Sequence, residues 1–467
     1  MRNAIAALLA ATTLAGCINM APKHERPALA TAPDYPAEFA GDVTLGQRAT
    51  DVAWRDFFAD PQLEALIAQA VERNRDLAVA IAQIEEARGL YRIQDADRLP
   101  TVGASADAAR TRGPSLTGTG TDTTNRYSVG VGVTAFELDF WGRVKNLSEA
   151  ARSQYLATEQ AERAFRLALV RDVASTYFAS RGAEEQIKLA EATVKSRKEG
   201  LRIAKLRLDA GVTSALDYRQ SETLLTQAET QLASLKLGKA QADNFLAVLT
   251  GGPVAGPLPA PLPLVAQGQS PTLTAGLPSD LLVARPDILA AEERLRAARA
   301  NIGAARAAFF PSISLTGTLG FASGSLDNLF SNDGFGWSFG PSISLPIFDF
   351  GRNKGNLTVA EARENIAVAT YERTVQGAFR EVADALAGRR YLAEQVEAQE
   401  RGTQATRRIA DLARKRYQEG VSTYLEVLDA ERNLFASEQT LIELRRAQVD
   451  NLVTLYVALG GGLVERR

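Results

Sequence analysis

The sequence predicts a mainly α-helical fold with a membrane β-barrel portion, on the basis of three observations. The chain of 467 residues repeats itself at an offset of about 209 residues, so it contains two copies of one design. Each copy has long helical runs without proline and two short stretches in which apolar residues alternate with small or polar ones. We therefore expect long coiled-coil helical hairpins that continue into strands of a shared barrel.

The repeat is clearest around a pair of glycines. Gly211 returns as Gly420, and the residues on either side return at the same spacing. The matched neighbours are Arg207 with Arg416, Val212 with Val421, Thr213 with Ser422, Leu216 with Leu425, and Asp217 with Glu426. Because both copies keep these positions, function is to be sought in what the repeated unit builds.

The N-terminus predicts export and lipidation. Arg2 precedes an apolar run from Ala4 to Leu14, which is too short to span a bilayer as a helix. The run leads into Ala15-Gly16-Cys17, which resembles a bacterial lipobox, so we expect cleavage after residue 16 and a lipid on Cys17. An ordinary signal peptide followed by an incidental cysteine is the alternative.

Composition argues against catalysis and against nucleic-acid binding. The formal net charge is −2, so no basic surface is expected to recruit nucleic acid. With one histidine, His24, and one cysteine, the chain cannot assemble a zinc site of the usual nitrogen and sulfur ligands or a Cys/His nucleophile. We expect no enzyme activity, no metal and no cofactor.

Helical patterns fill most of both copies. Residues 61–98 read as one helix that ends before a Leu-Pro pair, and a long helix begins near Lys145. The second copy repeats this order, with a helix over about 279–308 and another from about Asn353. The run 355–418 has no proline and would reach about 95 Å, so it needs neighbours along its length.

A heptad-like stripe of apolar residues provides for such neighbours. It runs through Ile187, Val194, Leu201 and Leu208 and returns as Val396, Thr403, Ala410 and Tyr417. Gly211 and Gly420 then mark turns, and Thr213-Ser214 and Ser422-Thr423 are placed to cap the returning helices. Each copy therefore ends in a helical hairpin whose tip is the glycine.

Four alternating stretches predict strands at about 100–111, 126–140, 311–322 and 336–348. From Trp337 onward the period is that of a membrane-spanning strand of about 10 residues. For any single stretch, a half-buried strand of a soluble sandwich is the alternative. Aromatic residues that could form interface girdles flank the strands, namely Trp141, Phe309, Phe310, Trp337, Phe348 and Phe350.

Four strands cannot close a barrel, and an open edge in lipid would leave backbone groups without hydrogen bonds. The barrel must therefore be shared between chains. Two chains would supply eight strands, whose interior is filled by side chains, whereas three would supply twelve and leave a lumen. Small residues on the inward face favour a passage, so we predict a trimer with a 12-stranded barrel.

The most specific sequence motif lies at the start of the second copy. It reads Gly276-Leu277-Pro278-Ser279-Asp280-Leu281-Leu282, then Arg285-Pro286-Asp287-Ile288, and later Phe310-Pro311-Ser312-Ile313. Essentially the whole mature chain resembles an outer-membrane factor of the TolC-like family, in the lipoprotein branch that serves tripartite efflux pumps. That family usually has paired arginines before the Pro-Asp pair, and Ala284 replaces the first of them here.

The resemblance implies a homotrimer that forms a passive exit duct. A 12-stranded barrel would lie in the outer membrane, in contact with its lipid, and an α-helical tunnel would extend into the periplasm. A periplasmic adaptor protein and a proton-driven inner-membrane transporter would dock below. Small molecules such as drugs would pass from the pump to the cell exterior.

The resemblance also implies a gate and docking tips. Acidic residues at the positions of Glu426 and Asp429 line the closed constriction in the family, and the repeat offers Asp217 in the first copy. A solvated helix face is the alternative for these acids. Ser422 stands where relatives carry a gating arginine. The residues expected to meet the adaptor are Gly211, Val212, Thr213, Ser214, Gly420, Val421, Ser422 and Thr423.

Several segments and alternatives follow from these observations. The expected segments are a signal peptide at 1–16, a lipidated tether at 17–50, a first repeat at 51–252, a Pro-rich linker at 253–278, a second repeat at 279–462 and a tail at 463–467. The tether and the linker can also be read as disordered connections. An outlet for type I protein secretion or for a metal-cation efflux pump would use the same duct, and the substrate cannot be read from the sequence.

Overall fold

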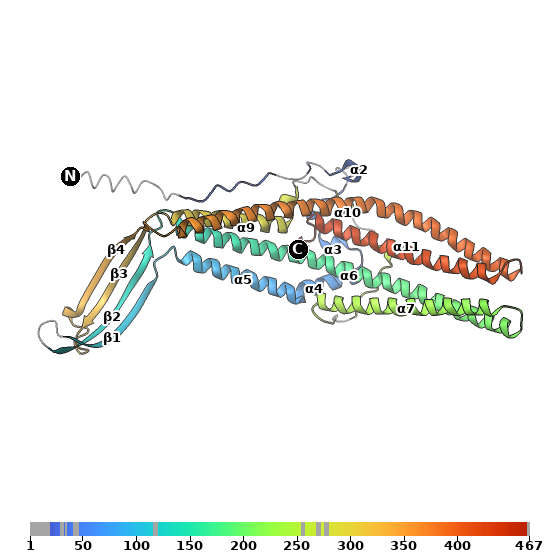
Figure 1. Ribbon diagram of the computed structural model, residues 1–467, viewed down its shortest axis with the longest axis horizontal. Helices are drawn as coiled ribbons and strands as arrows, with labels where there is room; N and C mark the ends of the chain where they lie inside the picture. Colours follow the sequence, from blue (N-terminus) through green and yellow to red (C-terminus); the bar gives the residue numbers. More distant parts are fainter. Residues whose placement is uncertain are drawn as a thin grey trace. The chain divides into compact units, whose positions relative to one another are not determined.

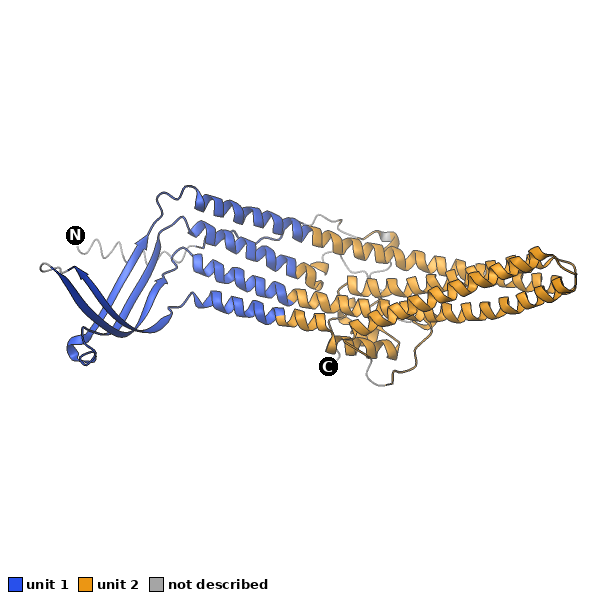
Figure 2. Cartoon of the chain, turned by 60° about the horizontal axis from the view of Figure 1, so that its bottom comes forward, with its two compact units in different colours: residues 1–28, 83–159, 290–372 blue, residues 29–82, 160–289, 373–467 orange. Residues whose placement is uncertain are grey.

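The computed structural model describes residues 19–28, 32, 35–40, 46–114, 120–253, 257–267, 272–274 and 280–464. The expected signal peptide, Cys17 and the motif residues 276–279 lie outside the described residues. The chain forms two compact units, coloured separately in Figure 2. Unit 1 comprises residues 1–28, 83–159 and 290–372, and unit 2 comprises residues 29–82, 160–289 and 373–467.

The repeat appears directly in the helices (Figure 1). The longer ones are α4 (Pro61–Arg73), α5 (Arg75–Ala96), α6 (Arg143–Asp209), α7 (Ala215–Leu249), α9 (Pro286–Ala307), α10 (Arg352–Gln418) and α11 (Tyr424–Ala458). Short helical segments are α2 (Ala37–Ala40), α3 (Trp54–Phe57) and α8 (Leu281–Ala284). The helices α6 and α10 have 67 residues each, α7 and α11 have 35 each, and α5 and α9 have 22 each.

Two helices that the sequence predicts as continuous are interrupted. The expected helix 61–98 breaks at Asn74, whose side chain accepts from the Leu77 N–H at 2.8 Å and donates to the Leu249 carbonyl at 2.9 Å. Asn74 thus starts a new helix and holds the end of α7. The expected helix 279–308 breaks at Arg285, because the residue before a proline is disfavoured in helical conformation.

Paired glycines end the long helices in the same way in both copies. Gly211 and Gly420 have φ of 72° and 74°, a left-handed conformation that glycine adopts without strain. The N–H of Val212 donates to the Arg207 carbonyl at 2.9 Å, and the N–H of Val421 donates to the Arg416 carbonyl at 3.0 Å. This is the Schellman motif, which satisfies carbonyls that a helix end leaves free.

Unit 1 contains one antiparallel sheet in the order β1-β2-β3-β4. The strands are β1 (Val102–Pro114), β2 (Thr121–Glu137), β3 (Ser312–Ser323) and β4 (Phe335–Ser344). β2 begins before the expected residue 126, and β4 ends before the expected residue 348. Pro346 has no N–H with which to extend the β4 ladder. β1 and β4 each have one edge without a partner strand in the described chain. The mainly helical fold with four strands is as predicted.

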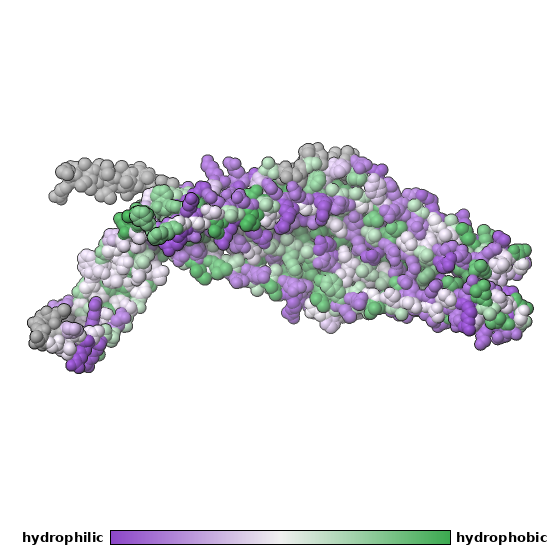
Figure 3. Space-filling model, in the orientation of Figure 1, coloured by the Kyte–Doolittle hydropathy of each residue, from purple (hydrophilic) through white to green (hydrophobic). Residues whose placement is uncertain are grey.

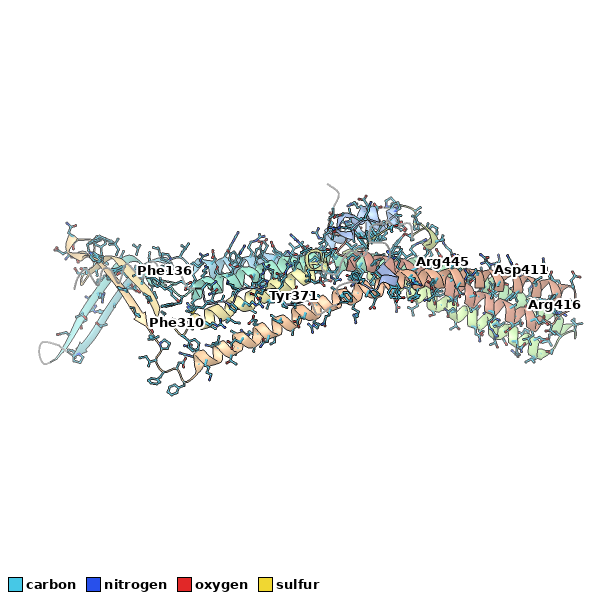
Figure 4. The ribbon with its side chains drawn as sticks, turned by 90° about the horizontal axis from the view of Figure 1, so that it is seen from above. Phe136, Phe310, Tyr371, Asp411, Arg416 and Arg445 are labelled. Atoms are coloured by element: carbon cyan, nitrogen blue, oxygen red, sulfur yellow. The ribbon has the colours of Figure 1, made fainter. Side chains whose placement is uncertain are left out.

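The register gathers the apolar residues on one face of the sheet. Val131 pairs with Leu319, and Leu319 pairs with Trp337, so Trp337 lies on the apolar face. A bulge lies between Val133 and Phe136, where Ala135 has φ of 54°. It shifts the alternation by one residue, so Phe136, labelled in Figure 4, remains on the apolar face.

The core of unit 2 is built around aromatic stacking and one buried carboxylate. Phe57 stacks on Tyr456 with ring centroids 4.0 Å apart. Asp60 has no exposed surface and accepts hydrogen bonds from the Tyr177 hydroxyl at 2.6 Å and the Leu262 N–H at 3.0 Å. The described residues 257–267 of the Pro-rich linker are thereby held against unit 2.

The heptad-like stripe packs as a seam within each hairpin. Between α6 and α7, the buried residues Val194, Leu225 and Ala228 form one cluster, with Leu201 against it. Between α10 and α11, the cluster is Ala410, Ala413, Val427 and Ala430, with Tyr417, Tyr424 and Leu434 against it. Among the described residues, no helix is both long enough and apolar enough to cross a membrane.

Candidate functional site at the hairpin tips

The two predicted tips lie at the same end of unit 2, at the right in Figure 1. A direct contact links the two hairpins just below them. The Arg207 guanidinium on α6 donates to the Tyr417 hydroxyl on α10 and lies 5.2 Å from the centroid of that ring. Tyr417 in turn packs against Tyr424 of α11 with centroids 5.0 Å apart. The repeat gives no signal of this link, because Leu208 and not Arg207 matches Tyr417 at the offset of 209 residues.

The first tip has a fully formed side-chain cap. The Ser214 hydroxyl accepts from the Asp217 N–H at 3.2 Å. The Asp217 carboxylate accepts from the Thr213 hydroxyl at 2.6 Å. The carboxylate predicted for the gate therefore already stabilises the start of α7, where a negative charge also interacts favourably with the helix dipole.

The second tip keeps the backbone turn and lacks the side-chain cap. Thr423 is the N-cap residue of α11, and its hydroxyl makes no capping hydrogen bond, so the expected cap is wrong on this side. The Ser422 hydroxyl is buried and has no hydrogen-bond partner within the described chain. In the repeat, Glu426 stands where the first tip has Asp217. The carboxylate that completes the first cap is therefore carried on a longer side chain at the second tip.

Each predicted gate acid of the second copy has an arginine partner in its own chain. The Glu426 carboxylate lies 3.9 Å from the guanidinium of Arg416, which Figure 4 labels near the end of α10. Asp429 pairs with Arg432 one turn along α11. All four side chains are about half exposed, so these pairs are weak and can be exchanged for other partners.

A buried arginine holds the two hairpins together further from the tips. Arg197 of α6 is 8% exposed, donates to the Leu224 carbonyl of α7 at 2.6 Å and lies 5.5 Å from the Phe435 ring of α11. Burial lowers the pKa of Arg197. Its position three residues after Val194 of the apolar stripe, one helical turn along the same side of α6, is the sequence signal that could have identified it.

Charged groups also meet where α11 packs on α6. Asp450 forms a salt bridge with Arg446 at 3.0 Å. Burial raises the pKa of Asp450 to about 6, although the Arg446 charge and a hydrogen bond from Ser175 act in the opposite direction.

The motif arginine Arg285 joins three elements of unit 2. It pairs with Asp287 at 2.7 Å and with Glu381 of α10 at 2.7 Å, and it donates to the last helical carbonyl of α11, on Ala458, at 3.2 Å. A cation at a helix C-terminus is favourable because of the helix dipole. Arg285 makes all three contacts even though Ala284 replaces the preceding arginine.

In unit 1, α9 holds residues 19–28, the first described segment of the N-terminal tether. The Glu292 carboxylate is 4% exposed and bonds His24 at 3.1 Å and Arg26 at 3.0 Å. Burial raises its pKa, but hydrogen bonds from Arg26 and His24 together with the positive charges of Arg26 and Arg296 outweigh that effect, so the pKa of Glu292 is lowered overall. Arg306 donates to the Met20 carbonyl at 3.3 Å. Among the residues that the structure describes, no cluster of three or more His, Cys, Asp or Glu is placed to hold a metal.

Comparison with known proteins agrees with the repeat and with the fold. Residues 66–252 and 277–461 both match the family described as outer membrane efflux protein. The chain is 45% identical over 462 residues to the solvent efflux pump outer membrane protein SrpC of Pseudomonas putida, with 97% of each chain covered. It is 42% identical over 453 residues to the cation efflux system protein CusC of Escherichia coli, with 97% of this chain and 98% of that one covered.

A solved structure also matches the fold of this chain. A membrane protein from Pseudomonas aeruginosa matches with a TM-score of 0.88 at 41% identity, over 95% of this chain and 100% of that one. The family and the relatives are efflux proteins of the outer membrane and not enzymes, which confirms the function predicted from the sequence. The chain belongs to the outer membrane efflux protein family.

Proposed function

We propose that three copies of this chain form a closed exit duct with a 12-stranded barrel and an α-helical periplasmic tunnel. The observation that carries this proposal is that β1 and β4 each have one edge without a partner strand in the part of the chain that the structure describes. The outward face of the sheet is apolar, and an open edge in hydrocarbon would cost several kcal/mol for each backbone group that lacks a hydrogen bond. For this reason β1 of one copy pairs with β4 of the next. A lipid on Cys17 adds a second anchor to the outer membrane.

The tips are the proposed docking surface for a periplasmic adaptor, which connects the duct to an inner-membrane transporter. Both tips present exposed apolar residues that a partner would cover: Val212, Leu216, Val421 and Leu425, each between 53% and 66% exposed. The proposed site comprises residues 211–214 and 420–423. No energy source is needed in the duct, and the only internal work is opening of the tip.

The proposed cargo is a small organic molecule, and a metal cation is the second candidate. The relative SrpC is named for solvent efflux, and CusC is named for cation efflux at nearly the same identity. A strain that lacks this chain should become sensitive to solvents, dyes and antibiotics and keep normal resistance to metal salts. The reverse pattern would favour the cation pump.

Assembly is the decisive test of the duct. In detergent, the purified mature chain should run as a trimer, and in a planar bilayer it should give small single-channel conductance. A stable monomer that retains its full β content would overturn the shared barrel.

Glu426 and Asp429 are the proposed acids of the constriction, with Asp217 beside them. Three copies would gather negative charge around a narrow aperture and make the channel cation-selective. Changing both Glu426→Ala and Asp429→Ala should remove that selectivity, whereas removing the partner charges with Arg416→Ala and Arg432→Ala should strengthen it.

The matched control is Glu438→Ala with Glu443→Ala, two acids further along α11 that pair with Arg407 and Gln186. This control should keep wild-type selectivity. Equal selectivity in all three double variants would show that Glu426 and Asp429 are only a solvated helix face.

A further inference from the structure

Two arginines continue the apolar face of the sheet beyond its last apolar row. On this face, the final apolar pair of β1 and β2 is Ala108 with Tyr127. The next two pairs on the same face are Arg110 with Asn125 and Arg112 with Thr123. Both arginines are exposed, and they lie near the hairpin that joins β1 to β2.

Hydrogen bonds show that the side chains keep alternating up to the end of the strand pair. The Arg112 Nε donates to the Thr121 hydroxyl at 3.1 Å, and Thr121 lies two residues before Thr123 on the apolar face. The Thr111 and Thr124 hydroxyls meet at 2.9 Å on the opposite face. The arginines therefore share a face with the apolar residues and not with the inward ones.

The charge distribution differs sharply between the two faces. Among the described strand residues, Arg110 and Arg112 are the only charged groups at apolar-face positions. The acids Asp107 and Asp122 and the base Arg126 occupy the opposite face. Neither Arg110 nor Arg112 forms a salt bridge within the described chain. Figure 3 shows hydrophilic residues at this end of the sheet, beyond a paler stretch of surface.

We propose that Arg110 and Arg112 bind phosphate groups of the phosphorylated glycolipid of the outer leaflet. The proposal rests on the membrane barrel described above. The helices adjoin the other end of every strand, so the β1–β2 hairpin lies on the exterior side when the helices are periplasmic. An arginine immediately beyond the apolar rows lies at the depth of lipid headgroups, where its planar fork matches phosphate.

The spacing suits this ligand. Residues two apart on one strand are separated by about 6.8 Å, so the two guanidinium groups can contact one phosphate or two neighbouring ones. Tyr127 forms the border between them and the apolar rows, a position typical of amphipathic aromatic rings. Three such pairs would surround the barrel of a trimer.

The experiment is a titration of the detergent-purified trimer with lipopolysaccharide, with bound lipid measured by native mass spectrometry. Arg110→Gln with Arg112→Gln should weaken binding by about tenfold or more, because two charge-assisted contacts are lost. Arg126→Gln removes a guanidinium from the opposite face of the same strand pair and should change binding by less than about twofold. If the double variant fails to assemble, the single variant Arg110→Gln is used.

Two further ligands test the chemistry of the site. Dephosphorylated lipopolysaccharide and phosphatidylglycerol should each bind to the wild type at least about tenfold more weakly than lipopolysaccharide. Equal binding of either one, or unchanged binding by the arginine variants in an intact trimer, would overturn the lipid site and leave the barrel standing. A wild-type chain that forms no trimer and inserts into no vesicle would overturn both.

Discussion

Helices α7 and α11 occupy equivalent places in the two repeats and have the same length, yet their surfaces differ. Among the described residues, α11 buries Val449, Val453 and Tyr456 near its C-terminus, in the core of unit 2. Over the corresponding stretch, α7 exposes Leu237, Phe245 and Val248, at 60%, 52% and 65%. The repeated backbone is therefore the same, but α7 leaves these three apolar residues exposed although it buries Leu225 and Leu249 within its own chain.

The difference teaches where a second chain is needed. A row of exposed apolar residues at helical spacing is unfavourable in water and is expected to be covered. The α11 counterpart of Leu237 is Arg446, a charged residue that pairs with Asp450 of the same helix. We therefore assign the α7 row to contacts between neighbouring copies in the proposed trimer.

The largest expected effect is loss of the trimer when this row is made polar. Leu237→Glu with Phe245→Glu would bury two carboxylates in each of three interfaces, so the chain should run as a monomer in size-exclusion chromatography with light scattering. Leu237→Met with Phe245→Leu keeps the row apolar and should remain trimeric. A trimer in the glutamate variant would mean that α7 faces solvent and that the comparison with α11 says nothing about assembly.

The next largest effect distinguishes glycines with the same backbone angle. Gly251 and Gly211 have φ of 73° and 72°, but a Cβ on Gly251 would lie 2.2 Å from the Arg73 carbonyl oxygen, whereas nothing lies within 4 Å at Gly211. Gly251→Ala should destabilise the protein by about 3 kcal/mol, and Gly211→Ala by about 1 kcal/mol, as measured by denaturant unfolding. Similar losses would show that backbone angle alone sets the effect.

A pH-dependent effect should be confined to α11. The pKa of Asp450 is raised from 3.8 to about 6, so its contribution to stability is fully present below pH 3.8 and is lost as the pH rises through about 6. Asp450→Asn should therefore be more stable than the wild type at about pH 8, by roughly 1 to 3 kcal/mol, and equally stable at about pH 4. A difference that does not vary with pH would contradict this reading of the buried carboxylate.

The smallest expected effect concerns the two tips. Ser214→Ala removes a side-chain cap and should cost about 1 kcal/mol locally, whereas Thr423→Ala removes none and should cost no more than about 0.3 kcal/mol. Hydrogen exchange of the amides in the first turns of α7 and α11 would measure both effects. Equal loss of protection in the two turns would show that the tips are capped alike in solution.

Sequence patterns were sufficient for features that depend on neighbours along the chain. The glycine turns at 211 and 420 follow from the repeat, and the apolar face of the sheet follows from alternation around Val131 and Leu319. The bulge at Ala135 was not predicted, because alanine has no intrinsic preference for positive φ and the partner strand imposes the shift.

Features that depend on distant residues could not be predicted in the same way. The break at Asn74 is stabilised by a carbonyl on Leu249, and the link between hairpins joins Arg207 to Tyr417. Glu426 and Asp429 could be recognised as candidate gate acids, but their arginine partners could not be assigned before the helices were placed.

The contact between Arg306 and Met20 sets a limit on where an acyl chain can enter the bilayer. Cys17 precedes Met20 by three residues, and three residues of extended chain reach at most about 11 Å. Arg306 lies six residues before β3 begins at Ser312. A lipid on Cys17 would thus be connected by only three residues to a point near the base of the proposed barrel. Its acyl chains would then enter the leaflet that faces the periplasm.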